Sequence, residues 1–125
     1  MTVLIDSWVW IEYWKGGKYA GNAAKYIEGE ERAFVSTINL LETYSWVARS
    51  YGEDIAKNKM ETIEKRTFII PLEKTISIEA AKLKLKHKLG VADAIVLATA
   101  KHVNGILITG DPDFEGIERV VLINR

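Results

Sequence analysis

Five short apolar runs divide the chain, and polar or turn-forming residues follow most of them. Each run is three or four residues long and contains no charged residue, which is typical of strands buried on both faces of a parallel sheet. The expected strands cover residues 3–5, 33–35, 68–70, 106–108 and 120–123.

The segments between these runs carry apolar residues at helical spacing. The expected helices cover residues 7–14, 19–27, 38–50, 53–65, 77–89 and 91–103. Hydroxyl and glycine residues favour the N-caps and C-caps of these helices, at Ser7, Ser36, Gly16, Gly52 and Gly90. Strands that alternate with helices predict an α/β fold, in which helices cover both faces of a parallel sheet.

The helix expected at residues 77–89 has a single well-spaced apolar series. Its members are Ile78, Ala81, Leu85 and Leu89, and we expect them to point inward.

Length and composition restrict the class of protein. The 125 residues are 48% hydrophobic and 27% charged, which fits one domain over residues 1–125. Seventeen Lys and Arg balance 17 Asp and Glu, so a phosphate-bearing partner needs a local patch or a metal ion. The lack of cysteine excludes zinc sites built on sulfur. Without a basic leader or an apolar run of membrane-spanning length, we expect a cytoplasmic protein with no membrane partner.

Carboxylates follow two of the expected strands. Asp6 comes directly after the first strand, and Thr109-Gly110-Asp111-Pro112-Asp113 follows the fourth. Ligands of open α/β sheets bind just beyond the carboxyl ends of the strands, so these carboxylates mark a candidate site if the two strands are neighbours. The alternative is an ordinary turn, because Asp and Pro favour turns by themselves.

Two further acids lie on expected helices, and helical periodicity predicts their surroundings. Asp93 shares a helix face with Val96 and Leu97, where a carboxylate is costly unless it is capped, paired or bound to a cation. The alternative is that Asp93 belongs to the first helical turn, where the helix dipole favours negative charge. Glu42 projects away from the apolar face of its helix, beside Asn39, which predicts a solvated side chain.

Four segments together resemble the motifs of PIN-domain ribonucleases, and the VapC toxins in particular. They are residues 4–7, 36–42, 92–100 and 109–114, and the resemblance extends in order over the whole chain. It implies a three-layer α/β/α fold with a five-stranded parallel sheet in the order 3-2-1-4-5. It also implies that the strands ending in Asp6 and Asp111 are neighbours.

The same resemblance implies the chemistry of the site. Its acidic residues are Asp6, Glu42, Asp93 and Asp111, with Asp113 and the hydroxyls of Ser7 and Thr109 in support, which overrules the helical periodicity for Glu42. Two carboxylates about 4 Å apart repel by roughly 4 kcal/mol at an effective dielectric constant of 20, so such a cluster requires a cation. Oxygen ligands favour Mg²⁺ or Mn²⁺, and the implied activity is metal-dependent hydrolysis of RNA phosphodiester bonds by an endoribonuclease. Whether Asp111 or Glu42 orients the attacking water stays open.

The first helix carries an excess of aromatic residues, which predicts a protein-binding surface. VapC-type toxins are inhibited by an antitoxin and commonly form homodimers. We therefore expect an antitoxin segment against Trp10, Tyr13 and Trp14, with an antitoxin arginine reaching the acidic site. The expected homodimer contact is helix 91–103, through Ile95, Ala98 and His102. The alternative is that neighbouring helices cover the aromatic face.

Three other classes of protein agree less well with the sequence. A receiver domain, which is a Mg²⁺-binding signalling module, would carry an acidic pair after the first strand and a phospho-accepting Asp after the third, where Ile70-Pro71-Leu72 stands. A non-catalytic PIN scaffold is disfavoured by the intact acidic set. Phosphatases with an Asp-x-Asp motif are excluded because Trp8 occupies the second Asp position.

Overall fold

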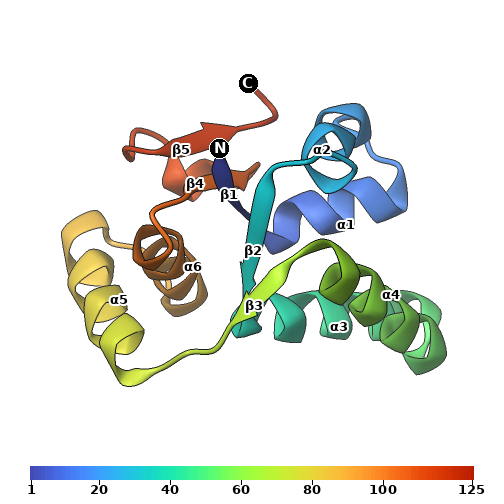
Figure 1. Ribbon diagram of the computed structural model, residues 1–125, viewed down its shortest axis with the longest axis horizontal. Helices are drawn as coiled ribbons and strands as arrows, with labels where there is room; N and C mark the ends of the chain where they lie inside the picture. Colours follow the sequence, from blue (N-terminus) through green and yellow to red (C-terminus); the bar gives the residue numbers. More distant parts are fainter.

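The computed structural model describes residues 1–125 and contains one five-stranded parallel sheet (Figure 1). Its order, β3-β2-β1-β4-β5, is the order that the family resemblance implied. It differs from the 2-1-3-4-5 order of receiver domains, so that alternative is wrong. The strands are β1 (Thr2–Ile5), β2 (Arg32–Ser36), β3 (Phe68–Ile70), β4 (Ile106–Thr109) and β5 (Val120–Leu122).

Six helices cover the sheet in two outer layers. They are α1 (Ser7–Lys15), α2 (Ala20–Ile27), α3 (Thr37–Tyr51), α4 (Glu53–Arg66), α5 (Lys74–His87) and α6 (Val91–His102). Figure 1 shows α5 and α6 on one side of the sheet and the other four helices on the opposite side. The α/β/α architecture is thus as predicted, and no helix is both long and apolar enough to cross a membrane.

The core is divided in two by the sheet. Leu4 and Leu107 pack with α5 and α6, whereas Val3, Ile5 and Ile108 pack with α1 and α2. Successive strand residues point to opposite faces, so an uninterrupted apolar run supplies both halves of the core. This is why the strands contain no polar alternation.

Two helix caps differ from the prediction. The N-cap of α1 is Asp6 and not Ser7, because Asp6 Oδ1 accepts a hydrogen bond from the Ser7 amide at 2.8 Å. The C-cap of α5 is Lys88, in the left-handed conformation with φ 57°, and Gly90 instead precedes α6. Gly16, with φ 64°, ends α1 as predicted.

The predicted inner face of α5 is wrong except at Leu89, which is buried just beyond the end of the helix. Ile78 and Leu85 are 53% and 81% exposed, and the buried residues are Ile76, Ala80 and Leu83. The helix begins at Lys74, earlier than expected, and therefore includes Ile76. Two apolar series of similar spacing occur on this helix, and only contact with α6 decides between them.

Candidate metal centre

The site is built where β1 and β4 lie side by side. Ile5 is in register with Ile108, so Asp6, just beyond β1, lies beside Thr109, the last residue of β4. Thr109 Oγ1 donates a hydrogen bond to Asp6 Oδ2 at 2.7 Å, and both residues are buried. The two strands that end in aspartate-bearing turns are therefore neighbours, at the carboxyl edge of the sheet.

The turn after β4 presents two more carboxylates. The Asp111 amide donates to Thr109 Oγ1 at 3.0 Å, and Asp111 Oδ1 accepts from the Asp113 amide at 2.9 Å. These bonds start the short 3-10 helix η1 (Pro112–Phe114). The turn is thus a regular Asp-capped turn and also a support that holds Asp113 beside Asp111.

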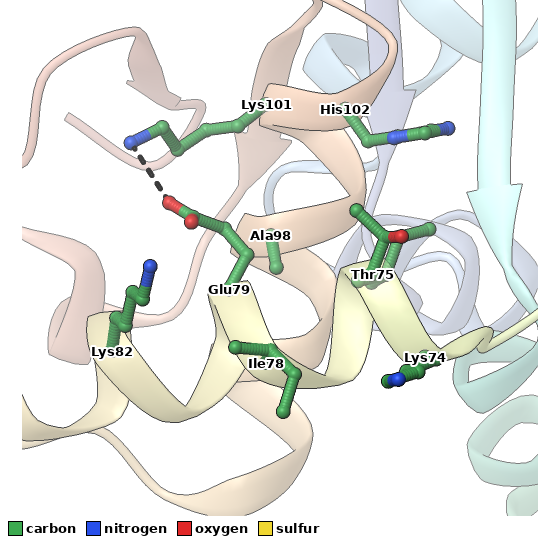
Figure 2. Close-up of a pocket in the computed structure, with 9 residues that line it drawn as sticks. Lys74, Thr75, Ile78, Glu79, Lys82, Ala98, Lys101 and His102 are labelled. Carbon is green, nitrogen blue, oxygen red and sulfur yellow. Dashed lines mark ion pairs between the residues drawn. The ribbon is translucent and has the colours of Figure 1, made fainter.

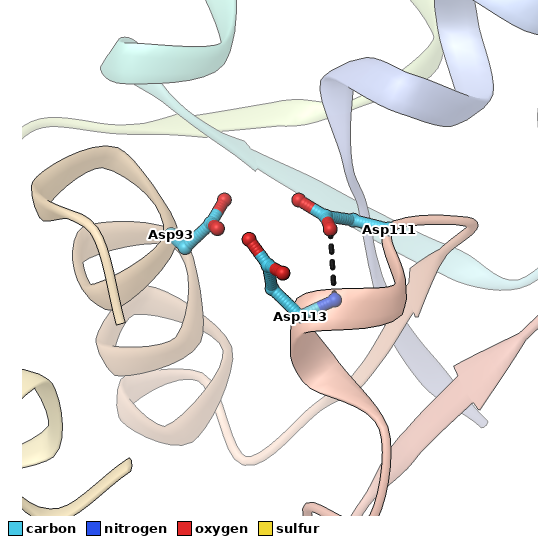
Figure 3. A group of neighbouring side chains, drawn as sticks. All are labelled: Asp93, Asp111 and Asp113. Atoms are coloured by element: carbon cyan, nitrogen blue, oxygen red, sulfur yellow. Dashed lines mark hydrogen bonds between the residues drawn. The ribbon is translucent and has the colours of Figure 1, made fainter. Parts of the chain in front are cut away.

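Three carboxylates converge at this turn. Asp93, in the first turn of α6, joins Asp111 and Asp113, and oxygen atoms from the three residues all lie within 4.8 Å of one another. Figure 3 shows the side chains of Asp93 and Asp111 approaching that of Asp113. Asp93 does occupy the first helical turn, as the alternative had it, yet it also faces other acids.

Glu42 approaches the same site from α3. Its Oε1 accepts a hydrogen bond from Ser7 Oγ at 2.8 Å, and Ser7 directly follows Asp6. The prediction that Glu42 is simply solvated is therefore wrong, because the carboxylate is partly buried and bonded. Asp6 and Glu42 lie outside the closest group of three and are connected to each other through Ser7 and Asn39.

Asn39 is a site residue that the sequence reasoning missed. It is fully buried, and its Nδ2 donates to Ser7 Oγ at 2.9 Å and to Asp6 Oδ1 at 3.3 Å. Its Oδ1 accepts from the Ser36 amide at 2.9 Å, which completes a capping box at the start of α3. The available signal was this Ser-x-x-Asn spacing, which resembles a capping box and places Asn39 on the inner side of the first turn.

The acids affect one another strongly. Burial, and then the charge of Asp111, raise the pKa of Asp93 to about 7. Burial raises the pKa of Asp6 to about 6, against the lowering effect of the Thr109 hydrogen bond, while Glu42 raises it further. The four ion pairs of the protein all involve other acids, so no lysine or arginine neutralises this cluster.

These residues fit a hard divalent cation. The donors are all carboxylate oxygens, three of them converge, and their negative charge has no protein cation beside it. Mg²⁺ and Mn²⁺ prefer such oxygen ligands, whereas zinc and copper favour sites that contain nitrogen or sulfur.

The largest hollow of the protein lies outside the acidic cluster. It lies between α5 and α6, has a volume of about 640 Å³ and is lined by lysines, including Lys74, Lys82 and Lys101 (Figure 2). Lys101 forms an ion pair with Glu79 at 3.5 Å. None of the five acids described above lines this hollow.

Two predicted contact surfaces are wrong in part. Trp10 is fully buried, and its indole Nε1 donates to the Ile5 carbonyl at 3.2 Å, so it is not available to a partner. Ile95 and Ala98 are buried in the core cluster that contains α5 residues, so they do not form a free dimer surface. Tyr13 and Trp14 remain partly exposed, because α1 turns only one side to the sheet.

Comparisons with known proteins agree with this geometry. The profile of the PIN domain family matches residues 3–120. No curated protein sequence matches the chain. Among solved structures, a toxin–antitoxin complex from Klebsiella pneumoniae contains a similar chain, with a TM-score of 0.81, 27% identity and 97% coverage of each chain.

Two further structures share the fold at lower identity. VapBC-1 from nontypeable Haemophilus influenzae has a TM-score of 0.76, 18% identity and 100% coverage of each chain. VapC20 from Mycobacterium tuberculosis, described as a sarcin-ricin loop cleaving toxin, has a TM-score of 0.77 and 15% identity, over 93% of this chain and 95% of that one. The family profile covers nearly the whole chain, and the chain therefore belongs to the PIN domain family.

Proposed function

We propose that this chain is a Mg²⁺- or Mn²⁺-dependent endoribonuclease and the toxin of a VapBC-type toxin–antitoxin pair. The observation that carries the proposal is the convergence of Asp93, Asp111 and Asp113 within 4.8 Å with no protein cation beside them. The structural neighbours include a toxin–antitoxin complex and a sarcin-ricin loop cleaving toxin, which supports an RNA substrate and an antitoxin partner for this chain.

Each acid has a role in this proposal. Asp93, Asp111 and Asp113 would hold the cation, while Asp6 and Glu42 would add negative charge to the same site. A divalent cation in such a site supplies Lewis-acid activation of the scissile phosphate and neutralises its charge. Ser7 and Asn39 hold Glu42 and Asp6 in place through their hydrogen bonds. Asp111 or Glu42 orients the attacking water.

Cation binding is tested by thermal unfolding in the presence of Mn²⁺ or Mg²⁺. A ligand that binds only the folded state at 100 times its Kd stabilises that state by about 2.7 kcal/mol. We therefore expect millimolar divalent ions to raise the Tm of the wild type, and EDTA to reverse the rise. A wild-type Tm that responds to divalent ions no more than the Tm of Asp93→Asn and Asp111→Asn, with no rise in any of the three proteins, would argue against a metal site.

Because Trp10 is buried, we propose an antitoxin-binding surface formed by residues near it. A hollow of about 240 Å³ is lined by Trp14, Val47, Tyr51, Ile55 and Lys59, and Tyr51 and Ile55 are 55% and 44% exposed. Such an apolar groove between helices suits a helical or extended segment with apolar anchors. We place the antitoxin segment here and against Tyr13, with an arginine that continues to the acidic site.

This placement is tested by inhibition of the nuclease. Trp14→Lys with Ile55→Lys should weaken inhibition by the antitoxin while RNA cleavage by the free toxin is retained. Undiminished inhibition of this variant would place the groove elsewhere.

A further inference from the structure

Trp8 lies directly against the turn that carries Asp111. A Cβ atom built on Gly110 would overlap Cε3, Cζ3 and Cδ2 of the Trp8 ring. Gly110 is buried and its φ is not in the left-handed region, so the need for glycine here comes from the tryptophan and not from the backbone. The close approach puts an indole on the residue between Thr109 and Asp111.

Asn124 bonds to the same residue. Its Nδ2 donates to the Gly110 carbonyl at 2.9 Å, just beyond the end of β5. The segment before Asn124 is itself fixed, because the Ile123 amide donates to the Thr109 carbonyl at 2.9 Å and the Ile123 carbonyl accepts from Asn22 at 2.6 Å. Gly110 is thus held by a ring from α1 and by an amide from the C-terminal segment.

Gly110 lies between two residues that support the acidic site. Thr109, on one side, is bonded to Asp6, and Asp111, on the other side, is bonded to Asp113. A shift of Gly110 would change the spacing between these acids. The spacing matters because Mg²⁺ requires ligands in near-octahedral geometry. Residues that orient metal ligands typically change affinity or activity by about 10- to 100-fold when they are replaced.

We propose that Trp8 and Asn124 are positioning residues that clamp Gly110 and thereby set the geometry of Asp111 and Asp113 for a divalent cation. This inference rests on the proposed function. Neither residue supplies a ligand. Both act through the backbone of the turn.

The first test exchanges size across the contact. Gly110→Ala alone should lower both the Tm and the Mn²⁺ affinity, because the new methyl group overlaps the ring. In a Trp8→Leu background the same Gly110→Ala change should have a much smaller effect, since the space is available. Strictly additive effects in this double-mutant cycle, measured by Tm, would show that the two residues are not in functional contact and would overturn the clamp.

The second test measures Mn²⁺ binding by calorimetry below the Tm of each variant, together with kcat and KM on RNA. Trp8→Ala and Asn124→Ala should each weaken Mn²⁺ binding by about tenfold and lower kcat more than KM, with partial recovery in Trp8→Phe. Phe68→Ala is the control, because it removes an aromatic side chain that is 59% exposed at the start of the edge strand β3. It should leave Mn²⁺ binding unchanged.

The outcomes separate the two claims. If the wild type binds Mn²⁺ and cleaves RNA, but Trp8→Ala and Asn124→Ala bind Mn²⁺ as tightly as the wild type, the clamp is wrong and the proposed function stands. If the wild type binds no Mn²⁺ and cleaves no RNA, the proposed function is wrong and the positioning role fails with it.

Discussion

Among the acids of the cluster, Asp93 has the pKa that is raised furthest. Its carboxylate is half-buried, and this burial, together with the charges of four other acids, raises its pKa to about 7. Keeping this group ionised in the metal-free fold is unfavourable. Residues retained for function often reduce stability in this way.

Replacing Asp93 with asparagine should therefore stabilise the protein and abolish its activity. The amide keeps the shape of the side chain and removes one repelling charge. We expect the Tm of metal-free Asp93→Asn to rise by about 3 °C or more, on a scale of several degrees per kcal/mol for a domain of this size. Cleavage of RNA should be lost. A variant that cleaves RNA at the parent rate would exclude Asp93 from the site.

Asp6→Asn should also raise the Tm of the metal-free protein and abolish RNA cleavage, but its rise in Tm should be smaller than that of Asp93→Asn. The pKa of Asp6 is raised to about 6, but its two oxygens accept hydrogen bonds from Ser7 and Thr109, and asparagine keeps only one acceptor. The measurement is again Tm and RNA cleavage. A large loss of Tm would mean that hydrogen bonding outweighs the charge at this position.

The raised pKa values also predict a pH dependence. Asp6 and Asp93 bind protons more tightly in the folded state than at the unfolded pKa of 3.8, so their contribution is most favourable at low pH. As pH rises from about 4 to about 7, these groups lower the free energy of unfolding of the metal-free protein. The stabilisation by Mn²⁺, which requires ionised carboxylates, should increase over the same range.

The measurement is Tm against pH for the wild type and Asp93→Asn. The advantage of the variant in metal-free buffer should grow from pH 4 to about pH 7 and then stay constant. An advantage that shrinks over this interval would contradict the raised pKa of Asp93.

At the scale of elements, local patterns predicted what depends on local sequence. The strands, the helix order and the carboxylates beyond β1 and β4 follow from apolar runs and turn residues, and they are found where expected. The family resemblance added the strand order and corrected Glu42. The buried faces of helices were harder to predict from the sequence. In α3, Asn39 and Thr43 are buried, whereas Leu41 is 61% exposed. A helical wheel assigns polar residues to solvent and cannot show a buried polar stripe that bonds to another element.

Asn39 is therefore the sharpest test at this scale. Asn39→Ala removes half of the capping box of α3 and the bonds to Asp6 and Ser7. Loss of such a cap costs about 1 kcal/mol, and loss of ligand orientation should lower kcat by about 10-fold or more. Asn58→Ala, on the exposed face of α4, is the control and should change neither Tm nor kcat appreciably. A stable Asn39→Ala variant with full activity would remove Asn39 from the site.

At the level of the whole molecule, two hollows on the surface have mostly apolar linings. One is the groove of Trp14, Tyr51 and Ile55, which we assign to the antitoxin. The other is on the α5–α6 side, where Leu72 and Val91 line a hollow of about 270 Å³ and are 43% and 64% exposed. Exposed patches of this kind mark interaction surfaces.

We propose that the expected homodimer contact lies at this second hollow, with Leu72 and Val91 in place of the buried Ile95 and Ala98. Leu72→Lys combined with Val91→Lys should shift a dimer to a monomer in light scattering at micromolar concentration. The double variant Lys57→Gln and Lys65→Gln, on exposed positions of α4, should leave the mass unchanged. A wild type that is strictly monomeric under these conditions would contradict the dimer.

The proposed function requires the acidic cluster to bind a divalent cation and to use it in the cleavage of RNA. The most direct measurement is cleavage of an end-labelled RNA by the purified chain, in Mn²⁺ and in EDTA, beside Asp111→Asn. We predict internal cleavage by the wild type in Mn²⁺, none in EDTA, and none by Asp111→Asn in either condition. Equal cleavage by the wild type and Asp111→Asn, or cleavage by the wild type that persists in EDTA, would contradict the proposal.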